Sequence, residues 1–366
     1  MIPELPNYLR SLGGGQYIGL IIALFTLTAG ASRPFSGKLA DTIGRIPVMY
    51  FGVAACIICG ILYPIWHTVI GFLIIRFLHG FSTGFKPTAS TAYVADVAPL
   101  LRRAEAMGIM GICASIGSSA SPPIGSWIVK NWGHNAMFYT SSVMAMLSMI
   151  ILIQLPESLK ERQKFKPSLL KVSKEDIFDP LIIPVVIVMI ASYFSYGVVL
   201  TLCSDLSDQL QVGNRALYFT LFTISSISTR FFAGKIADRI GRVPVILFSI
   251  WVLIISMLIF ANAHEKHLFY IGSIFFGLGV GIFFPAISAW TIDLGEEDKR
   301  GRAMATMYIS LEVAIGSGAF ISGSYVGNDT HKVSIMFYFS AALAFLGWMY
   351  LYWRQRKEKV IMISED

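Results

Sequence analysis

The stretch GKLADTIGRIPV at residues 37–48 returns almost unchanged as GKIADRIGRVPV at residues 234–245. Each copy places a lysine, an aspartate and an arginine between long apolar runs, in a chain that is 55% hydrophobic and only 14% charged. The copies lie 197 residues apart, and the same offset pairs many further positions, from Arg33 with Arg230 to Met107 with Met304. The chain therefore consists of two copies of one unit.

Composition places these units in a membrane. The mean hydropathy of the 366 residues is +0.65, and a run of about 20 apolar residues can cross a hydrocarbon core of about 30 Å as a helix. Because lipid offers no partners to backbone N–H and C=O groups, each run must satisfy its own hydrogen bonds, which favours helices. We expect eleven spans, at residues 16–36, 46–66, 70–95, 105–129, 135–155, 181–203, 215–233, 243–263, 267–291, 303–326 and 333–353.

The repeat and the spans predict an all-α polytopic membrane protein with two pseudo-symmetric helix bundles. The first bundle is expected at residues 1–155, and the second, with a C-terminal tail, at residues 181–366. Residues 156–180 form a polar, basic linker between them and are the only long loop that the sequence predicts. No soluble catalytic domain is therefore expected.

The basic residues predict the orientation. One set of alternating loops, with the C-terminal tail, contains 22 of the 29 lysines and arginines, and loops rich in these residues face the cytoplasm. Both copies of the motif, and the C-terminus, are therefore expected on the cytoplasmic side of a bacterial cytoplasmic (inner) membrane. The exceptions are Arg10, Lys130, Arg215, Lys266 and Lys332 in the opposite loops, and Arg76 and Lys86 within a span.

The first repeat is incomplete at its start. Met1 aligns with Val198, inside the span 181–203, so the first half lacks most of the counterpart of that helix. Residues 2–12 correspond to its outer end and the following loop. We expect a complete product with twelve helices and a cytoplasmic N-terminus, owing to a start assigned too late or a truncated chain; a genuine eleven-helix protein is the alternative.

The doubled motif G-x-[LI]-A-D-x-I-G-R-x-P, between the second and third helices of each half, closely resembles the signature loop of the major facilitator superfamily. An even number of spans separates the copies, so the repeats are parallel, as are the two halves of these transporters. The resemblance implies the twelve-helix drug:proton antiporter branch. It also implies two cytoplasmic gate motifs, formed by Gly37, Asp41, Gly44 and Arg45 and by Gly234, Asp238, Gly241 and Arg242.

The chemistry of the motif suits a gate. Gly37 lets the helix end approach a neighbour, and Gly44 permits the turn. Asp41 can accept hydrogen bonds from a helix N-terminus or pair with a nearby cation, beside Arg45. Such a charge cluster can hold the cytoplasmic side closed in one state and release it in the other; a mere topology anchor is the alternative. Asp96 and Asp293 are expected only to close their helices before a repeated loop.

The stretch LIIRFLHGFSTG at residues 73–84 resembles the family's motif in the fourth helix, an arginine followed four residues later by a glycine. Intramembrane charge usually faces a partner or a water-filled cavity. Arg76 and His79 are therefore proton-coupling candidates, and Lys86 and Thr83 are substrate-cavity candidates. With Ser90 they lie within about 80° of one another on a helix. The alternatives are snorkelling of Arg76 and Lys86 to water and a structural hydrogen bond for His79.

The stretch GSSASPPIGSW at residues 117–127 resembles the motif that marks antiporters of this superfamily, G-x-x-x-G-P-x-x-G-G. Gly117, Pro122 and Gly125 match the motif, while Ser121 and Ser126 replace glycines. Small residues at this spacing let helices pack closely, and the proline bends the segment. The resemblance implies antiport, and ordinary packing of small residues is the alternative.

Glu312 lies about ten residues into the span 303–326, where an ionisable group is costly without a partner or a task. Members of the drug:proton antiporter branch often carry an acidic residue in this helix. The resemblance therefore makes Glu312 a proton-coupling candidate that loads and releases a proton near neutral pH. A static salt bridge with Lys86 or Arg76 is the alternative.

Aromatic side chains in the spans 181–203 and 267–291 fall on helices that line the cavity in this family. Each of them could instead only pack against its neighbours or sit at the membrane interface. The substrate-cavity candidates among them are Tyr193, Tyr196, Phe284 and Trp290.

No cofactor, metal site or enzymatic activity is expected. Cys56 and Cys59 form a C-x-x-C in the middle of a span without a second ligand pair. The five histidines other than His79 lie at or near outer loops without an acidic partner at ligand spacing. The sequence contains no G-x-x-x-x-G-K-[ST] loop for ATP.

The sequence thus predicts a proton-coupled secondary transporter that works by alternating access and exports drugs or small metabolites. The expected partners are a small-molecule substrate, protons and the lipid bilayer, without nucleic acid, and the protein is expected to be a monomer. Two alternatives remain open. One is a proton symporter that imports a small organic anion, motivated by the basic stripe in the span 70–95, and the other is a non-transporting membrane sensor.

Overall fold

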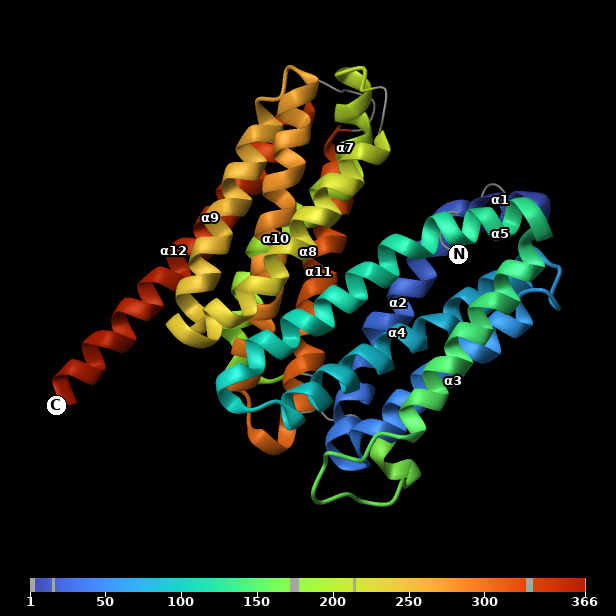
Figure 1. Cartoon of the computed structure of the whole chain (residues 1–366), viewed down its shortest axis with the longest axis horizontal. Coiled ribbons are helices and arrows are strands. Elements are labelled where there is room, and N and C mark those ends of the chain that lie inside the picture. Colours follow the sequence, from blue (N-terminus) through green and yellow to red (C-terminus); the bar gives the residue numbers. More distant parts are fainter. Residues whose placement is uncertain (1–3, 15–16, 172–177, 213–214, 327–331, 366) are drawn as a thin grey trace. The chain divides into compact units, whose positions relative to one another are not determined.

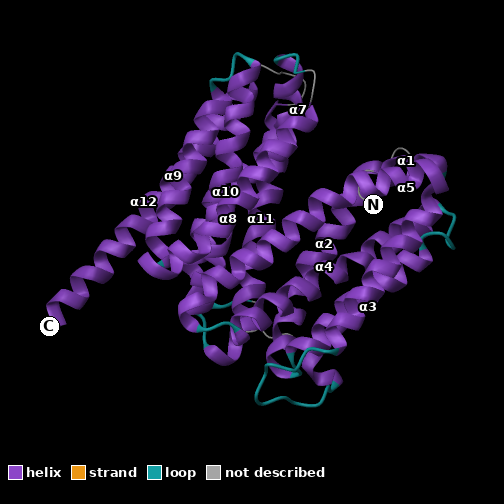
Figure 2. Ribbon diagram, viewed as in Figure 1, coloured by secondary structure: helices purple, strands orange, loops and turns teal. Residues whose placement is uncertain are grey.

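The computed structural model describes residues 4–14, 17–171, 178–212, 215–326 and 332–365. Helices make up most of this part of the chain, and none of its residues lies in a β-strand (Figure 2). The all-α fold expected from the sequence is confirmed. The linker residue Lys174 lies outside the described part.

The helices of the first half are α1 (Leu5–Ser11), α2 (Ile18–Thr42), α3 (Arg45–Leu62), α4 (Val69–Val97) and α5 (Arg103–Ile153). α5 covers two of the expected spans, 105–129 and 135–155. The non-helical residue Gly133, with φ 81° and ψ 173°, separates them. The helices of the second half are α7 (Ile183–Gln209), α8 (Arg215–Ile240), α9 (Arg242–Ala261), α10 (Lys266–Leu294), α11 (Arg300–Val326) and α12 (Val333–Glu365).

Eight stretches of the described chain are long and apolar enough to cross a membrane, and each covers most of one of the eleven expected spans. The other three expected spans lie in α2, α5 and α8: the span 16–36 from Ile18 onward, 105–129 and 215–233. They are helical, but they are rich in Gly, Ser and Thr, and α2 and α8 also carry Arg33 and Arg230. Polar residues of this kind lower the hydropathy of a helix, and they are tolerated where it packs against protein.

The chain divides into two compact units that do not follow the repeat boundary. Unit 1 comprises residues 1–97, 116–179 and 295–308, and unit 2 comprises residues 98–115, 180–294 and 309–366. The beginning of α5 therefore belongs to unit 2, and the beginning of α11 belongs to unit 1. Each repeat contributes the beginning of one helix to the unit formed mainly by the other repeat.

In unit 1, α4 packs along both α2 and α3 (Figure 1). Aromatic side chains join the short helix α1 to α3 and α5. The ring centroids of Tyr8 and Phe138 are 5.0 Å apart, and those of Tyr63 and Phe138 are 4.7 Å apart. These rings belong to a buried cluster that also includes Cys59 and Phe72. The cluster fixes the end of unit 1 that lies away from the repeated motif.

In unit 2, α10 packs along α8 and α9, and α12 packs along α7 and α9 (Figure 1). Phe260 of α9 joins two of these neighbours. Its ring centroid lies 5.3 Å from that of Phe337 in α12 and 6.0 Å from that of Phe269 in α10. The arrangement α8, α9 and α10 corresponds, by the offset of 197, to α2, α3 and α4 in unit 1.

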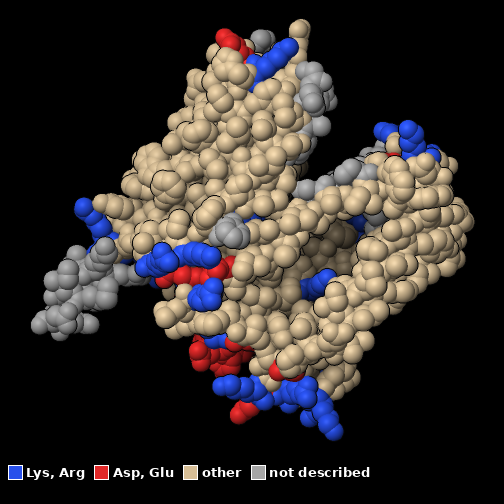
Figure 3. Space-filling view, in the orientation of Figure 1, with Lys and Arg blue, Asp and Glu red and all other residues tan. Residues whose placement is uncertain are grey.

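The surface is apolar along the helices. Large side chains such as Ile70 (73% exposed) and Phe320 (75% exposed) point outward. On the face drawn in Figure 3, the sides of the helices are almost without charge, and charged groups gather mainly near helix ends. Exposed apolar patches of this extent mark a surface that is covered by lipid or protein, so the chain is an integral membrane protein.

Glycines related by the repeat bring helices into close contact. A Cβ atom on Gly80 of α4 would lie 2.8 Å from the Cβ of Thr28 in α2. A Cβ atom on Gly277 of α10 would lie 2.9 Å from the Cβ of Ser225 in α8. Real Cβ contacts are not this short, so these positions exclude any larger residue unless the helices separate.

We expect Gly80→Ala and Gly277→Ala each to destabilise the protein by about 1–3 kcal/mol, the usual cost of overpacking. The measurement is the thermal unfolding midpoint of the purified protein in detergent. The control is Gly316→Ala, because a Cβ atom there would meet no atom within 4 Å. Unchanged midpoints for Gly80→Ala and Gly277→Ala would contradict the close helix contacts.

Candidate functional site

The two copies of the motif form the same tight turn between consecutive helices. Gly44 precedes α3 with φ 118°, and Gly241 precedes α9 with φ 97°. Residues other than glycine rarely adopt this backbone conformation. Each turn holds the aspartate at the end of one helix beside the arginine at the start of the next, four residues apart in sequence.

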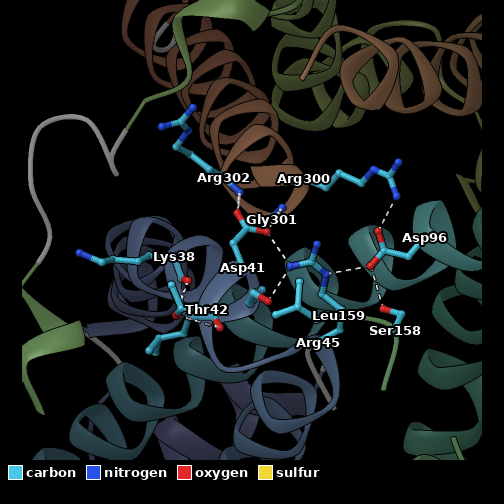
Figure 4. Close-up of polar contacts among 12 residues, drawn as sticks. Lys38, Asp41, Thr42, Arg45, Asp96, Ser158, Leu159, Arg300, Gly301 and Arg302 are labelled. Atoms are coloured by element: carbon cyan, nitrogen blue, oxygen red, sulfur yellow. Dashed lines mark hydrogen bonds and ion pairs between the residues drawn. The ribbon is translucent and has the colours of Figure 1, made fainter. Parts of the chain in front are cut away.

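Asp41 caps the beginning of α11. One carboxylate oxygen accepts a hydrogen bond from the N–H of Gly301 at 2.7 Å, and the other accepts from Arg302 at 2.8 Å (Figure 4). The first N–H groups of a helix have no partner within the helix and attract negative charge. Gly37 makes the approach possible, because a Cβ atom there would lie 2.8 Å from the Cβ of Ala305.

Asp238 caps the beginning of α5 in the same way. Its two carboxylate oxygens accept hydrogen bonds from the N–H groups of Ala104 at 3.1 Å and Glu105 at 2.9 Å. Gly234 lies against the backbone at Ala104, where a Cβ atom would collide. The acceptors and the donors are both related to those of Asp41 by the offset of 197, so the repeat preserves the whole interaction.

Each capping aspartate belongs to a chain of alternating charges. In unit 1, Arg45 lies 2.6 Å from Asp41 and 3.0 Å from Asp96, and Asp96 lies 2.6 Å from Arg300 (Figure 4). The hydroxyl of Ser158 donates to Asp96 at 2.7 Å. We call Asp41, Arg45, Asp96 and Arg300 the first latch.

The corresponding residues of unit 2 form the second latch, which consists of Asp238, Arg242, Asp293 and Arg103. Arg242 pairs with Asp238 and lies 3.0 Å from Asp293, which lies 3.2 Å from Arg103. The side chain of Asp293 is 28% exposed, whereas that of its counterpart Asp96 is 11% exposed. The second latch is therefore the more hydrated of the two, and solvent screens its charges more strongly.

Asp41 lies beyond the end of the expected span 16–36. Burial raises the pKa of its carboxyl to about 6 from an ordinary value of 3.8, although Arg45 and the N–H groups of Gly301 and Arg302 act in the opposite direction. Withdrawal of the carboxylate from water thus outweighs its favourable contacts. The stability of the first latch therefore depends on whether Asp41 is protonated.

Both ends of the linker, residues 156–180, are hydrogen-bonded to helices of this site. Glu157 accepts hydrogen bonds from the N–H groups of Arg45 at 2.9 Å and Ile46 at 3.0 Å, and so caps α3. At the other end, the N–H of the fully buried Asp179 donates to Thr306 in α11 at 3.1 Å. Sequence reasoning missed both acids, because the repeat gives no counterpart for linker residues.

Sequence reasoning also assigned Asp96 and Asp293 too small a role. It treated them as the ends of their helices, whereas each joins two arginines of a latch. A signal was available: Asp96, Asp293, Arg103 and Arg300 all fall in the repeat register, as the residues of the motif do.

Arg76 and His79 are buried within unit 1. Arg76, 2% exposed, donates from Nε to the carbonyl of Ile21 at 2.9 Å, and its guanidinium lies 4.3 Å from the ring centroid of Phe25. His79 Nδ1 lies 3.4 Å from the hydroxyl of Tyr63. These contacts can by themselves account for both polar side chains, and a role in proton coupling stays a prediction.

The polar stripe of α4 divides between different neighbours. Arg76 contacts α2, whereas Lys86 donates from Nζ to the hydroxyl of Ser148 in the second part of α5 at 2.9 Å. Thr83, which lies between Arg76 and Lys86 in the sequence, is half-buried. The rotation of about 80° between Arg76 and Lys86 is enough to point them at different helices. The substrate-cavity role of Lys86 and Thr83 stays a prediction.

The antiporter-type segment lies within α5. Gly117 is exposed, and a Cβ atom there would meet no atom within 4 Å in the described structure, whereas Gly125 is buried. The side chain of Pro122 lies outside the described part. Ser126 donates to the carboxylate of Glu4 at 2.5 Å, so the segment is connected to the beginning of α1. Its role in antiport stays a prediction.

The candidates in unit 2 differ in exposure. Tyr193 and Trp290 are buried, at 4% and 7% exposed, whereas Tyr196 and Phe284 are half-buried. Glu312 is half-buried near the middle of α11. Among the described residues, no group of His, Cys, Asp or Glu side chains could hold a metal ion. Cys59 belongs to the buried cluster around Phe72, as expected for a packing residue.

Comparison with known proteins agrees with this geometry. The family model described as Major Facilitator Superfamily matches residues 1–212 and 185–361. The quinolone resistance protein NorA of Staphylococcus aureus (strain MSSA476) is 25% identical over 311 residues, which cover 81% of this chain and 78% of NorA. The uncharacterized MFS-type transporter YhhS of Escherichia coli (strain K12) is 24% identical over 366 residues, covering 96% of this chain and 87% of YhhS.

Solved structures show the same fold. The human organic anion transporter MFSD10 (TETRAN) has a TM-score of 0.80 at 17% identity, over 96% of this chain and 89% of MFSD10. The proton:xylose symporter XylE has a TM-score of 0.78 at 13% identity, over 96% of this chain and 90% of XylE. With the repeated latches and the match of the family model along the chain, these likenesses identify the chain as a member of the Major Facilitator Superfamily, a transporter and not an enzyme.

Proposed function

We propose that this transporter is a monomeric, proton-coupled exporter of drugs or small metabolites in a bacterial cytoplasmic membrane, with its C-terminus in the cytoplasm. It would work by alternating access, and the two latches would be its cytoplasmic gate. The observation that carries this proposal is the pair of aspartates, Asp41 and Asp238, that cap helices begun by the other repeat.

The energetics of the latches suit a reversible gate. Taking ions out of water costs several kcal/mol each, and their mutual attraction in the interior roughly offsets this cost. A buried network of ion pairs can therefore be complete in one state and hydrated in another with only a small difference in free energy. An apolar contact of the same area would not be balanced in this way, because exposing it to water when the cytoplasmic side opens would cost free energy without any gain in hydration.

Support for export comes from NorA, whose name refers to quinolone resistance. A membrane transporter confers resistance most simply by moving the drug out of the cell. Support for proton coupling comes from Glu312, an ionisable side chain near the middle of α11 that is neither fully buried nor fully exposed. Such a group can exchange protons with water when the transporter opens.

We expect Asp41→Ala to open the first latch, because the N–H groups of Gly301 and Arg302 then lose their acceptor. Loss of a helix cap costs about 1 kcal/mol, so amide hydrogen exchange of residues 300–305 should accelerate about fivefold or more. Asp298→Asn is the control, because Asp298 is exposed beside the same helix start. Equal exchange in Asp41→Ala and the control would argue against the latch.

The first latch should strengthen as the pH falls. The pKa of Asp41 is about 6 when the carboxyl is buried and 3.8 ordinarily, so between these values the latched state binds more protons. The added stability is complete below the lower value and is lost as the pH rises through the upper one. The ratio of exchange rates between Asp41→Asn and the wild type at each pH should reveal this dependence. A constant ratio from pH 4 to pH 7 would contradict it.

We expect Glu312→Gln to abolish proton-driven accumulation of a fluorescent quinolone, the drug class in the name of NorA, in everted membrane vesicles while leaving downhill exchange of the quinolone intact. The neutral side chain keeps the size of glutamate but cannot release a proton. Glu161→Gln is the control, since Glu161 is exposed in the linker. Wild-type accumulation in Glu312→Gln would remove this residue from the mechanism. Accumulation of substrate only in right-side-out vesicles with an inward proton gradient would favour import over export.

A further inference from the structure

Arg33 and Arg230 are related by the repeat, but their surroundings differ. Arg33 in unit 1 is 3% exposed, and its guanidinium lies 4.4 Å from the ring centroid of Tyr308. It also donates to the hydroxyl of Thr88 at 3.3 Å, while the hydroxyls of Tyr308 and Thr91 lie 3.0 Å apart. The ring of Tyr308, itself held by Thr91, and the hydroxyl of Thr88 thus contact this buried arginine.

The position in unit 2 that corresponds to Tyr308 is occupied by Gly111. The Nη1 atom of Arg230 lies so close to Gly111 that a Cβ atom there would collide with it. The glycine therefore leaves room for the guanidinium and contributes no ring to cover it. Arg230 is half-buried as a result, and its Nε donates to the hydroxyl of Ser226 at 3.3 Å.

Aromatic residues lie near Arg230. The ring centroid of Phe284 in α10 lies 5.6 Å from the guanidinium carbon. Tyr196 in α7 packs against the two helices that carry Arg230 and Phe284, with its ring centroid 6.3 Å from that of Phe222 in α8 and 5.6 Å from that of Phe276 in α10. Tyr196 is itself held by a stacked ring, that of Tyr193, at 5.7 Å and an interplanar angle of 7°. All three of Arg230, Tyr196 and Phe284 are half-buried.

We propose that Arg230, Tyr196 and Phe284 form a recognition subsite for substrates that carry a carboxylate on a planar aromatic ring. This inference rests on the proposed function and adds a substrate class to it. The planar guanidinium presents paired N–H donors that match a carboxylate, the phenol of Tyr196 supplies a further donor, and the face or edge of Phe284 suits an aromatic ring.

The subsite places anion recognition outside the span 70–95, whose basic stripe motivated the alternative of an organic-anion importer. Arg76 in that span is 2% exposed and bonded to the carbonyl of Ile21, and Lys86 is bonded to Ser148. Arg230 is more exposed than Arg76, and the ring of Phe284 lies beside its guanidinium. The basic group that suits a substrate anion therefore lies in unit 2.

The test is a binding comparison between two probes, naphthalene-2-carboxylate and naphthalene-2-carboxamide, on the full chain purified in detergent. The shift of the thermal unfolding midpoint with probe concentration gives each dissociation constant. We expect the wild type to bind the carboxylate roughly tenfold or more tightly than the amide, as for one charged hydrogen-bonded pair. Arg230→Gln should remove this preference, and Arg230→Lys should keep part of it.

Two further variants separate recognition from stability. Arg33→Gln removes the repeat-related arginine, and its preference for the carboxylate should equal that of the wild type even though its unfolding midpoint falls. Gly111→Ala keeps the charge of Arg230 but displaces the guanidinium, so the preference should shrink. If Arg230→Gln does not fold, Gly111→Ala and Arg230→Lys still decide the outcome.

Equal affinity of the wild type for the two probes would overturn the subsite. A preference that survives in Arg230→Gln, or in Gly111→Ala where the former does not fold, would also overturn it. A loss of preference in Arg33→Gln equal to that in Arg230→Gln would show a general effect of charge and refute the assignment. Binding in detergent needs no proton gradient, so failure of proton-driven transport would leave this result unaffected.

Discussion

The beginnings of α11 and α5 depend on acceptors that their own helices cannot supply. The N–H groups of Gly301 and Arg302 find them in Asp41, and those of Ala104 and Glu105 find them in Asp238. Much of the surrounding structure follows from this need. Gly37 and Gly234 give the backbone room to approach, and because of these contacts each unit includes the beginning of a helix from the other repeat.

Charge suits this contact to the reversible gate that we propose. A carboxylate at a helix N-terminus gains from the macrodipole and from hydrogen bonds, but it loses its hydration. The pKa of Asp41, raised by burial to about 6, shows that for this group the loss is the larger effect. The arginines Arg45 and Arg300 compensate the aspartates of the first latch without making its separation prohibitive, since each of the four charges can be hydrated singly when the helices part.

The sequence allowed the repeat, the all-α fold and the chemistry of the motif to be predicted, including a helix N-terminus as a possible partner of Asp41. It could not identify that helix, because the hydrogen bond to Gly301 joins residues 260 positions apart. Glu157 and Asp179 escaped prediction because linker residues have no repeat register. The angles of Arg76 and Lys86 on their helix could be predicted, but their different neighbours in α2 and α5 could not, since a period of 3.6 residues fixes angles on a helix and not the elements that pack there.

The internal repeat distinguishes residues that suit the proposed gate, which are the same in both halves, from residues that can recognise a substrate, which differ. The residues of the two latches are identical in kind: Asp41 and Asp238, Arg45 and Arg242, Asp96 and Asp293, Arg300 and Arg103. In the alternating-access cycle that we propose, opening and closing would act on both halves alike, so the same contacts would serve twice. A substrate lacks the symmetry of the repeat, and the groups that bind it must differ between halves. The divergent pairs Tyr308 with Gly111, Arg76 with Ser273 and Glu312 with Ser115 are where such differences lie. Of these, the exchange of a tyrosine ring for a glycine alters the environment of an arginine that both halves retain, and thereby turns a structural cation in one half into a recognition group in the other.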